Sequence, residues 1–345
     1  MKITDVDKNF KIESKITRPG LRFYSALGAP FKIYGVFYEN GKFRRTPEDV
    51  AKSVSQWVYY LHTNTAGGRV RFKTNSPYVA IYAELNEPGK MPHFPLSGSC
   101  GFDLYVGEKY KGTFMPPFDV STSYESVIDL GNKKMRDITI NFPLYSGVSA
   151  LYIGLKEGCE ALPPDEYRVE KPVVYYGSSI TQGGCASRPG NAYEAIVTQK
   201  TGVNHVNLGF SGSAKAEKEI SDYICSLDMS AFVFDYDHNA PTTDHLRNTH
   251  ERMFKEVRES HPTTPIIMLS RPKYTLTREE KERVNIIKAT YENALSAGDK
   301  NVYFIDGKTL MRHCHNEGTV DNCHPNDWGF YSMAQALTKV IKKIL

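Results

Sequence analysis

The stretch that decides the fold of this chain is Val173-Val174-Tyr175-Tyr176-Gly177-Ser178-Ser179-Ile180-Thr181. Its first four residues are β-branched or aromatic, and such a short apolar run predicts a buried strand. A glycine and two serines follow at once, so the strand delivers a side-chain hydroxyl to the edge of a sheet. We therefore regard Ser179 as a candidate nucleophile.

The residues after this stretch alternate between apolar runs and helical stretches. Strands that alternate with helices over residues 172–345 predict a parallel sheet covered by helices on both faces. Ligands bind such sheets beyond the carboxyl ends of the strands. The strands are expected near 172–177, 204–209, 231–236, 265–270 and 302–306, and the helices near 190–201, 214–226, 244–260, 277–298 and 328–344.

The N-terminal part of the chain follows a different pattern, in which short β-like runs alternate with clusters of Gly, Asn, Ser and Pro. This spacing is typical of a β-sandwich or a jelly roll. Helical periodicity is scarce there, apart from a single turn near residues 47–50. The clearest runs are 69–74, 78–83, 101–106 and 150–155.

These two patterns divide the chain into two domains, which its length of 345 residues also favours. We expect an all-β sandwich or jelly-roll domain over residues 1–160 and an α/β domain over residues 172–345. Residues 161–171 are expected to form a linker, because this region is polar and contains the pair Pro163-Pro164.

Composition and charge are those of a soluble globular protein, with 40% hydrophobic and 24% charged residues. The net charge is only +4, and Lys and Arg are spread along the chain, so we expect neither nucleic acid nor a membrane as partner. Residues 1–8 lack the hydrophobic core of a signal peptide. The expected location is the cytoplasm, or the periplasm or exterior if a leader was removed. The six cysteines show no tight repeated spacing and indicate no disulfide framework, and the oligomeric state stays open.

The block Asp321-Asn322-Cys323-His324 offers the base that a serine nucleophile needs. A serine hydroxyl is a poor nucleophile until a neighbouring base removes its proton. Histidine suits that task because its unperturbed pKa lies near 6.5. Asp321 stands three residues before His324, so one tight turn lets its carboxylate orient the imidazole. Pro325 disfavours a helical conformation at His324, which keeps that residue in a loop.

Two further blocks offer hydrogen-bond donors for the oxyanion that develops in acyl transfer. They are the residues 207–212 and 237–239, which lie at the ends of two further apolar runs. The backbone N–H groups of Ser179 and Gly212 and the side-chain amide of Asn239 can supply three donors. Losing one such donor typically costs about 10²–10³ in rate. An Asx turn is the alternative role for Asn239, but the four blocks together predict a serine hydrolase.

In the order Gly-x-Ser-x-Thr, Asn-x-Gly-x-Ser-Gly, Asp-x-Asn and Asp-x-x-His-Pro, the four blocks resemble the SGNH/GDSL hydrolase superfamily. The resemblance covers residues 172–345 and implies a three-layer α/β/α domain with five parallel strands in flavodoxin-like order. It implies Ser179 as nucleophile, His324 as base and Asp321 as the residue that orients the base. The implied oxyanion hole consists of Ser179, Gly212 and Asn239.

A narrower resemblance concerns a subgroup of this superfamily that carries an N-terminal β-rich domain. Gly101-Phe102-Asp103-Leu104-Tyr105 is similar to the Gly-x-Asp-Leu-Tyr signature of that domain, and the subgroup commonly has Tyr-Gly-Ser-Ser-Ile-Thr-Gln-Gly, as here at 176–183. With this domain the resemblance covers nearly the whole chain. The chain departs from the broader pattern at Ser178, where the superfamily usually has aspartate. It also departs around Asn239, with Asp-Tyr-Asp-His-Asn in place of Gly-x-Asn-Asp.

Two other kinds of site fit the sequence less well. Residues 177–184 superficially resemble a phosphate-binding loop, but they lack the lysine that must follow a Walker glycine. His and Cys residues gather at 313–315 and 323–324, yet their spacing matches no common zinc pattern. A metal on His324 would also leave Ser179 without a base. We therefore expect no metal and no cofactor.

The substrate is less constrained than the reaction. The predicted function is a serine esterase that cleaves short-chain esters. Relatives with a β-rich domain often remove acetyl groups from carbohydrates, so an O-acetylated glycan is the preferred substrate, and the partner is a small-molecule or oligosaccharide ester. Arg188 is a candidate for binding the substrate, with a rigid turn before the next helix as the equal alternative.

Two alternative functions are kept open. One is a lipid or thioester acyl hydrolase, although the chain has no long apolar lid segment that would cover a long acyl chain. The other belongs to a different class, a glycan-binding protein whose hydrolase domain has lost activity. The presence of all five candidate site residues speaks against this second alternative.

Overall fold

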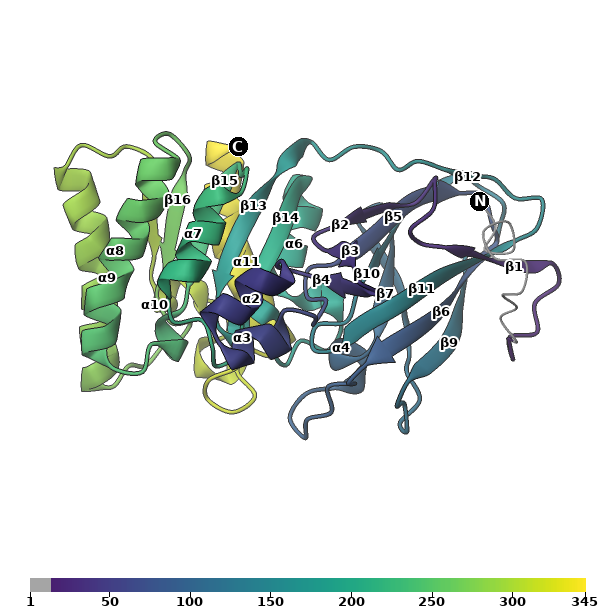
Figure 1. The fold of residues 1–345 in the computed structure, drawn as a ribbon, viewed down its shortest axis with the longest axis horizontal. Coiled ribbons are helices and arrows are strands. Elements are labelled where there is room, and N and C mark those ends of the chain that lie inside the picture. The colour runs from purple at the N-terminus through teal and green to yellow at the C-terminus, as the bar shows by residue number, and fades with distance from the viewer. Residues whose placement is uncertain (1–13) are drawn as a thin grey trace. The chain divides into compact units, whose positions relative to one another are not determined.

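A five-stranded parallel sheet forms the centre of the C-terminal unit (Figure 1). The computed structural model describes residues 14–345, so residues 1–13, with the start of the first predicted domain and the segment 1–8, lie outside the described residues. The strand order is second, first, third, fourth, fifth along the chain, which is flavodoxin-like and confirms the predicted fold class. In that order the strands are β14 (Val203–Gly209), β13 (Val169–Gly177), β15 (Ala231–Asp235), β16 (Ile266–Leu269) and β17 (Val302–Ile305).

Helices cover both faces of this sheet, as predicted (Figure 1). On one face lie α7, α8 and α9, where Leu246 of α8 and Phe234 of β15 share one buried apolar cluster. On the other face lie α6 and α11, and the rings of Tyr193 and Phe330 stack between these two helices. The helices are α6 (Tyr193–Thr201), α7 (Lys218–Ser226), α8 (Thr243–Ser260), α9 (Arg278–Ser296) and α11 (Asp327–Ile344).

The start of α11 keeps the preceding segment in a loop. Asn326 caps this helix, because its side-chain oxygen accepts hydrogen bonds from the N–H groups of Trp328 and Gly329. Pro325 stands directly before the cap, and a proline disfavours the helical conformation of the residue before it. His324 therefore lies in a loop, as the sequence predicts.

Two short helices, α2 (Glu48–Val54) and α3 (Gln56–Leu61), belong to the same unit as the parallel sheet. The sequence predicts only a turn near residues 47–50, so the two helices differ from the prediction. Ser55 ends the first helix and caps the second, its hydroxyl accepting from the N–H of Val58. With seven and six residues, neither helix completes the two turns that make an apolar period visible. Their buried side chains, which join the apolar cluster of this unit, are Ala51, Val58 and Leu61.

The other unit is β-rich and consists mainly of antiparallel sheets, as predicted (Figure 1). Alternate residues of its strands point into a second apolar core. Phe72 pairs with Ile138 and Val70 with Ile140, and all four side chains are fully buried. One sheet consists of β1 (Leu21–Ser25), β11 (Gly147–Lys156), β6 (Tyr78–Asn86) and β9 (Ser123–Asp129). The other consists of β12 (Ala161–Leu162), β5 (Arg69–Thr74), β10 (Arg136–Asn141), β7 (Phe102–Val106) and β8 (Lys109–Phe114), with β2 (Lys32–Tyr34) paired to β5.

The two compact units differ from the predicted domains, because the chain passes between them more than once. Residues 46–62 belong to the parallel-sheet unit, where α2 and α3 bury their apolar side chains. Residues 187–190 belong to the β-rich unit, which binds them through hydrogen bonds. The parallel-sheet unit comprises Thr46–His62, Tyr167–Ala186 and Asn191–Leu345, and the β-rich unit comprises the described residues up to Arg45 with Thr63–Glu166 and Ser187–Gly190.

The predicted linker over residues 161–171 is partly structured. Its first two residues form β12 and pair with β5 in the β-rich unit. Its last residues form the beginning of β13, which starts at Val169. The polar and proline-containing part between these strands is therefore shorter than predicted.

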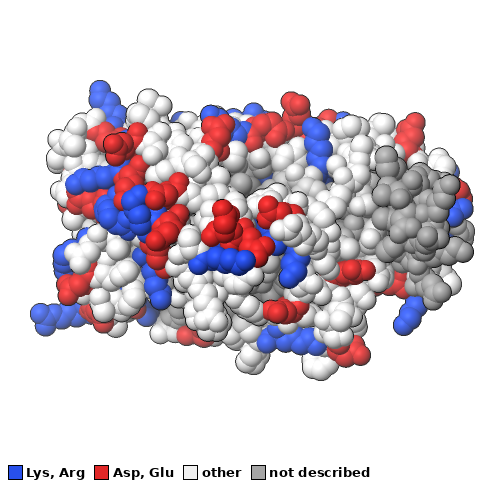
Figure 2. All heavy atoms as spheres, viewed as in Figure 1, with Lys and Arg blue, Asp and Glu red and all other residues white. Residues whose placement is uncertain are grey.

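Charged side chains of both signs are interspersed over the face that Figure 2 shows. Several form ion pairs within one helix, such as Lys218 with Asp222 on α7 and Lys255 with Glu251 on α8. Within residues 14–345, no helix is long and apolar enough to cross a membrane. All six cysteines lie within the described residues and are free thiols.

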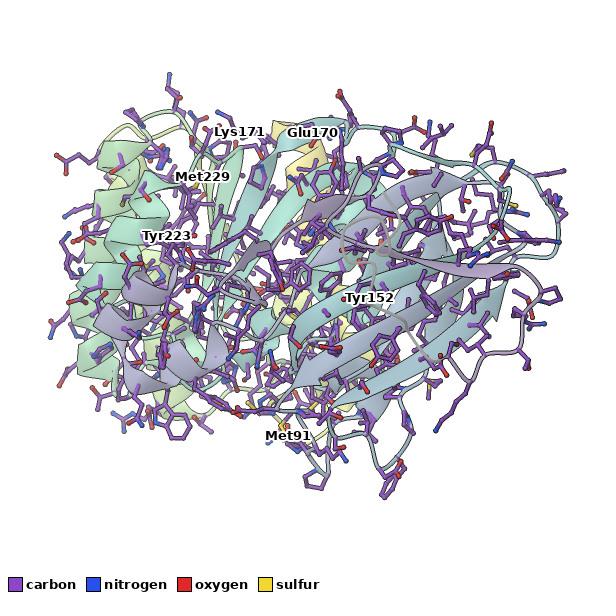
Figure 3. The ribbon with its side chains drawn as sticks, turned by 45° about the vertical axis from the view of Figure 1, so that its right-hand side comes forward. Met91, Tyr152, Glu170, Lys171, Tyr223 and Met229 are labelled. Carbon is purple, nitrogen blue, oxygen red and sulfur yellow. The ribbon has the colours of Figure 1, made fainter. Side chains whose placement is uncertain are left out.

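The direction of β13 places Ser179 at one edge of the parallel sheet. Glu170 and Lys171, labelled in Figure 3, lie near the amino end of this strand. The strand runs nine residues to Gly177, so the residues that follow emerge at the opposite edge. That carboxyl edge is where ligands bind in folds of this kind.

Candidate active site

Ser179 is the first residue of the short helix α5 (Ser179–Gln182), which begins where β13 ends. Ser178 caps this helix, because its hydroxyl accepts a hydrogen bond from the N–H of Ile180 at 3.2 Å. Ser178, which stands where the SGNH/GDSL superfamily usually has aspartate, therefore stabilises the turn that carries Ser179. Ser179 itself is 8% exposed, whereas Ile180 and Thr181 beside it are fully buried.

The strand ends around this turn pack too closely for a side chain at Gly177. A Cβ there would lie 2.3 Å from the carbonyl oxygen of Asp235, which belongs to the neighbouring strand. Backbone hydrogen bonds run from the N–H of Phe210 to Gly177 at 2.8 Å and from the N–H of Ser178 to Asp235 at 3.0 Å. The two flanking strands therefore hold Ser179 in one position.

Ser179, His324 and Asp321 form a hydrogen-bonded chain. Ser179 Oγ lies 2.9 Å from His324 Nε2, although 145 positions separate the two residues in the sequence. On the other side of the ring, His324 Nδ1 donates to Asp321 Oδ2 at 2.7 Å. The structure thus brings the three predicted residues together, in an arrangement by which an imidazole can remove the proton of a hydroxyl.

Asp321 is oriented by its own loop. Its second oxygen, Oδ1, accepts hydrogen bonds from the backbone N–H groups of Cys323 at 3.0 Å and His324 at 2.7 Å. Burial alone would raise the pKa of Asp321, but the hydrogen bonds from the ring and backbone of His324 outweigh it and lower the pKa to about 2. The carboxylate is therefore ionised at neutral pH, where it can hold the Nδ1 proton of His324.

Two thiols of this unit are held in the protonated form. Burial, together with the nearby charge of Asp321, raises the pKa of Cys185 to about 12. Burial also raises the pKa of Cys323, whose sulfur lies 3.6 Å from Nδ1 of His238. Because the thiolate and not the thiol is the nucleophile, these cysteines are poor competitors of Ser179.

The predicted oxyanion donors Gly212 and Asn239 lie on two linked segments. Gly212 adopts a left-handed conformation with φ of +68°, and a Cβ there would meet no atom within 4 Å, so its backbone borders open space. Asn239 is the last residue of η2 (Asp237–Asn239), and its side-chain oxygen accepts from the N–H of Ala214 at 3.2 Å. That bond ties η2 to the Gly212 segment and directs the side-chain NH₂ of Asn239 away from Ala214.

Arg188, the predicted substrate-binding residue, pairs with Asp103 within the β-rich unit. Its guanidinium donates to Asp103 Oδ2 at 2.8 Å and also to the hydroxyl of Tyr105. Asp103 is fully buried and accepts in addition from the N–H of Gly190 at 2.8 Å. The carboxylate of the Gly-x-Asp-Leu-Tyr block therefore anchors residues 187–190. These contacts favour the rigid-turn alternative, and substrate binding by Arg188 stays a prediction.

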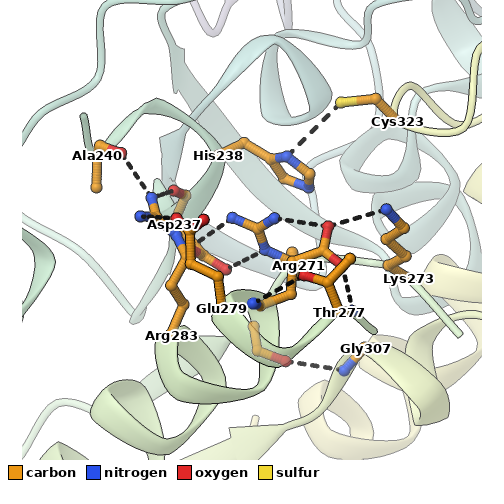
Figure 4. Close-up of polar contacts among 12 residues, drawn as sticks. Asp237, His238, Ala240, Arg271, Lys273, Thr277, Glu279, Arg283, Gly307 and Cys323 are labelled. Atoms are coloured by element: carbon orange, nitrogen blue, oxygen red, sulfur yellow. Dashed lines mark hydrogen bonds and ion pairs between the residues drawn. The ribbon is translucent and has the colours of Figure 1, made fainter. Parts of the chain in front are cut away.

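Two arginines that were not predicted from the sequence bind Asp237 of η2 (Figure 4). Asp237 pairs with Arg271 and Arg283, and Arg271 also pairs with Glu280. Arg271 follows β16 almost directly, so it carried the same signal that identified the other blocks, a polar residue at the end of an apolar run. Arg283 lies inside α9, and nothing in the surrounding sequence marks it.

Asp235 is a buried carboxyl at the carboxyl end of β15. Among residues 14–345, neither of its carboxyl oxygens has a hydrogen-bond partner. Burial raises its pKa well above the ordinary value, and the neighbouring charge of Asp237 adds to the effect. Above about pH 4 the unfolded chain has released this proton while the native protein keeps it, so the stability of the native protein falls as the pH rises.

We expect Asp235→Asn to remove this pH dependence. From about pH 4 upward, the unfolding free energy of the variant should rise relative to that of the wild type, by up to about 1.4 kcal/mol per pH unit. Urea unfolding followed by circular dichroism at several pH values measures it. Glu259→Gln, at an exposed position on α8, is the control and should show a difference that changes little with pH. Parallel stability curves for Asp235→Asn and wild type would contradict the expectation.

Two family profiles match the chain. Residues 170–342, half of its length, match the GDSL-like lipase/acylhydrolase family. Residues 21–160 match GxDLY, the N-terminus of SGNH hydro-type esterases. The two matches follow one another along the chain and do not overlap.

Several solved structures share the fold over nearly the whole chain. A protein described as a GDSL-like lipase from Bacteroides ovatus is 28% identical, with a TM-score of 0.83 over 94% of this chain and 98% of its own. A salicylyl-acyltransferase from a tetracycline biosynthetic pathway is 19% identical, with a TM-score of 0.77 over 95% of this chain and 99% of its own. An acetyl xylan esterase from the rumen bacterium Butyrivibrio proteoclasticus is 11% identical, with a TM-score of 0.60 over 94% and 98%. Among curated proteins, none matches the chain.

Proposed function

We propose that this chain, which belongs to the GDSL-like lipase/acylhydrolase family and is an ester-bond hydrolase, cleaves short-chain esters by a Ser-His-Asp mechanism. The observation that carries the proposal is the hydrogen-bonded chain from Ser179 Oγ through the ring of His324 to Asp321. All three side chains come from loops and turns at the carboxyl edge of one rigidly packed sheet. Such a scaffold keeps the reacting groups in position without a cost at the moment of reaction.

In this mechanism, Ser179 Oγ attacks the carbonyl carbon of the ester while His324 Nε2 takes the serine proton. Asp321 keeps the proton on Nδ1, so that Nε2 presents its lone pair to the serine, and its charge stabilises the imidazolium. As the bond between carbonyl carbon and alcohol oxygen breaks, His324 gives its proton to the leaving alcohol. A water molecule then attacks the acyl group, with its proton passing to His324 and from there back to Ser179.

The tetrahedral intermediate places negative charge on the former carbonyl oxygen. We assign the backbone N–H groups of Ser179 and Gly212 and the side-chain NH₂ of Asn239 as donors to that oxygen. The open space beside the Gly212 backbone and the hydrogen bond that fixes the Asn239 amide support this assignment. Such donors raise kcat because they bind the oxyanion more strongly than the ground-state carbonyl.

An acetyl ester of a carbohydrate is the proposed substrate. An acetyl xylan esterase shares the fold over 94% of this chain, so that fold accommodates deacetylation of a glycan. The side chains of His324 and Asp321 are 23% and 38% exposed, which supports a leaving alcohol that departs on the solvent side. The alternatives are the lipid or thioester acyl hydrolase and the inactive glycan-binding protein.

The test combines a series of p-nitrophenyl esters, from acetyl to octanoyl, with acetylated oligosaccharides whose released acetate is measured. We expect rates that fall with acyl length and acetate release from at least one glycan. Comparable rates on acetyl and octanoyl esters, with no acetate from the glycans, would favour the lipid or thioester alternative. A wild-type protein that is inert on all of these esters would favour the glycan-binding alternative.

A further inference from the structure

An ion-pair network lies buried behind the turn η2, outside the groups that take part in the proposed chemistry (Figure 4). Its centre is Asp237, the first residue of η2, which is 1% exposed. Arg271 donates to both oxygens of this carboxylate, at 2.8 Å from Nε and 3.0 Å from Nη2. Arg283 donates to Oδ1 of the same carboxylate through Nε at 2.8 Å. Burial would raise the pKa of Asp237, but the bonds and charge of Arg271 lower it, so the carboxylate stays ionised.

Arg283 also binds the backbone of the turn. Its Nη2 donates to the carbonyl oxygen of Asp237 at 2.7 Å and to that of Ala240 at 2.5 Å. These two carbonyl groups bracket the remaining residues of η2. Arg283, which is 4% exposed on α9, therefore binds both ends of the turn and the side chain at its start through one guanidinium.

The other two residues of η2 face the proposed catalytic groups. Asn239 accepts from the N–H of Ala214, which connects it to the Gly212 segment. His238 approaches the sulfur of Cys323, the residue next to His324 in the chain. A shift of η2 would therefore move Asn239 relative to Gly212.

We propose that Arg283, acting through Asp237 and the carbonyl oxygen of Ala240, is a positioning residue that holds the Asn239 amide at the oxyanion. The inference rests on the proposed function, since it needs Asn239 to be a donor. Lysine at this position keeps the positive charge but cannot reach three acceptors in one plane, as a guanidinium does. Arg283→Lys should therefore loosen η2 and weaken the hydrogen bond from the Asn239 amide to the oxyanion, which is strongest in the transition state.

The chain contains a matched control for the structural role of such an arginine. Arg258 on α8 donates through Nε to Asp299 at 2.8 Å, and it binds the carbonyl oxygens of His261 and Thr264 at 2.9 and 2.6 Å. Like Arg283, it is largely buried and joins one carboxylate to loop carbonyl groups. Its partners lie in the loops that precede β16 and β17, at the edge of the sheet opposite the proposed site.

The first experiment compares Arg283→Lys with Arg258→Lys in the full chain, using p-nitrophenyl acetate well below the Tm of each variant. Both substitutions should lower the Tm. Only Arg283→Lys should lower kcat, by roughly 10- to 100-fold with little change in KM, because a displaced oxyanion donor costs transition-state stabilisation. Equal effects of the two variants on kcat would overturn the inference, since a general loss of stability would then explain both.

The second experiment is a double-mutant cycle with Asn239→Ala. If Arg283 acts through Asn239, Arg283→Lys should have little further effect on kcat once the amide is gone. Full additivity of the two losses would overturn the positioning role and leave the donor role intact. An Asn239→Ala variant with wild-type kcat would remove the donor role, and the inference with it. Loss of turnover in Ser179→Ala reports on the esterase mechanism independently of both outcomes.

Discussion

Ser179→Ala is expected to abolish the hydrolysis of p-nitrophenyl acetate, with a loss of at least about 10⁴-fold in kcat. In the proposed mechanism, the substitution removes the atom that forms the acyl-enzyme while the base and the donors remain. Initial rates against a reagent blank measure the loss. The fold should be retained, because backbone hydrogen bonds join the strand ends around the turn and the substitution leaves them in place. Circular dichroism and the Tm check this point.

Ser178→Ala is the matched control, since it removes a hydroxyl from the adjacent residue. The hydroxyl of Ser178 caps α5, so its loss should cost about 1 kcal/mol of stability. More than a tenth of the activity should remain, because the nucleophile is intact. An organophosphorus probe should label wild type and Ser178→Ala but not Ser179→Ala, which mass spectrometry of the labelled peptide reports. The reverse pattern would assign the nucleophile to Ser178 and contradict the proposed mechanism.

The parallel-sheet unit could be predicted from the sequence because its signals are local. Each strand is an apolar run, and helices with an apolar face separate the strands. Parallel strands place their carboxyl ends at one edge, so Ser179, Gly212 and Asn239 could be assigned to a common edge without a structure. His324 could be added because it lies in the loop that follows the fifth apolar run.

The helices α2 and α3 could not be predicted for the opposite reason. They are short, and what stabilises them is the burial of Ala51, Val58 and Leu61 against residues far along the chain. Helix formation in such short segments depends on tertiary packing rather than on propensity. Their place in the parallel-sheet unit is therefore a property of the folded chain, which the local pattern before residue 63 does not contain.

Arg283 was missed because its environment depends on tertiary structure. A charged residue on an amphipathic helix is usually solvated, and three glutamates lie within four positions of Arg283 along α9. Only the folded chain shows that Asp237 lies beneath it and that its guanidinium is buried. Arg271 differs, since it follows an apolar strand as the other site blocks do and could have been identified on that ground.

Asp321→Asn is expected to lower kcat by about 10³- to 10⁴-fold, the second largest effect. The asparagine amide can present its NH₂ to Nδ1 of His324, which favours the ring tautomer with the proton on Nε2. That tautomer cannot accept the proton of Ser179. The loss of the negative charge also removes the stabilisation of the imidazolium. Stopped-flow or steady-state rates on p-nitrophenyl acetate at neutral pH measure the effect, with Asp327→Asn in the first turn of α11 as the control.

The pKa of Asp321 determines the pH range over which the activities of wild type and Asp321→Asn should differ. Its folded value of about 2 lies below the ordinary value of about 3.9, so its contribution to stability is complete above about pH 4 and is lost as the pH falls toward 2. Between pH 4 and pH 8 the wild-type carboxylate is therefore always ionised, and the activity of Asp321→Asn should stay low across that whole range. Because the side chain is 38% exposed, the stability lost in the variant should be at most about 1 kcal/mol. A variant that keeps more than a tenth of wild-type activity at pH 7 would show that Asp321 does not orient His324, and the base would then need another partner.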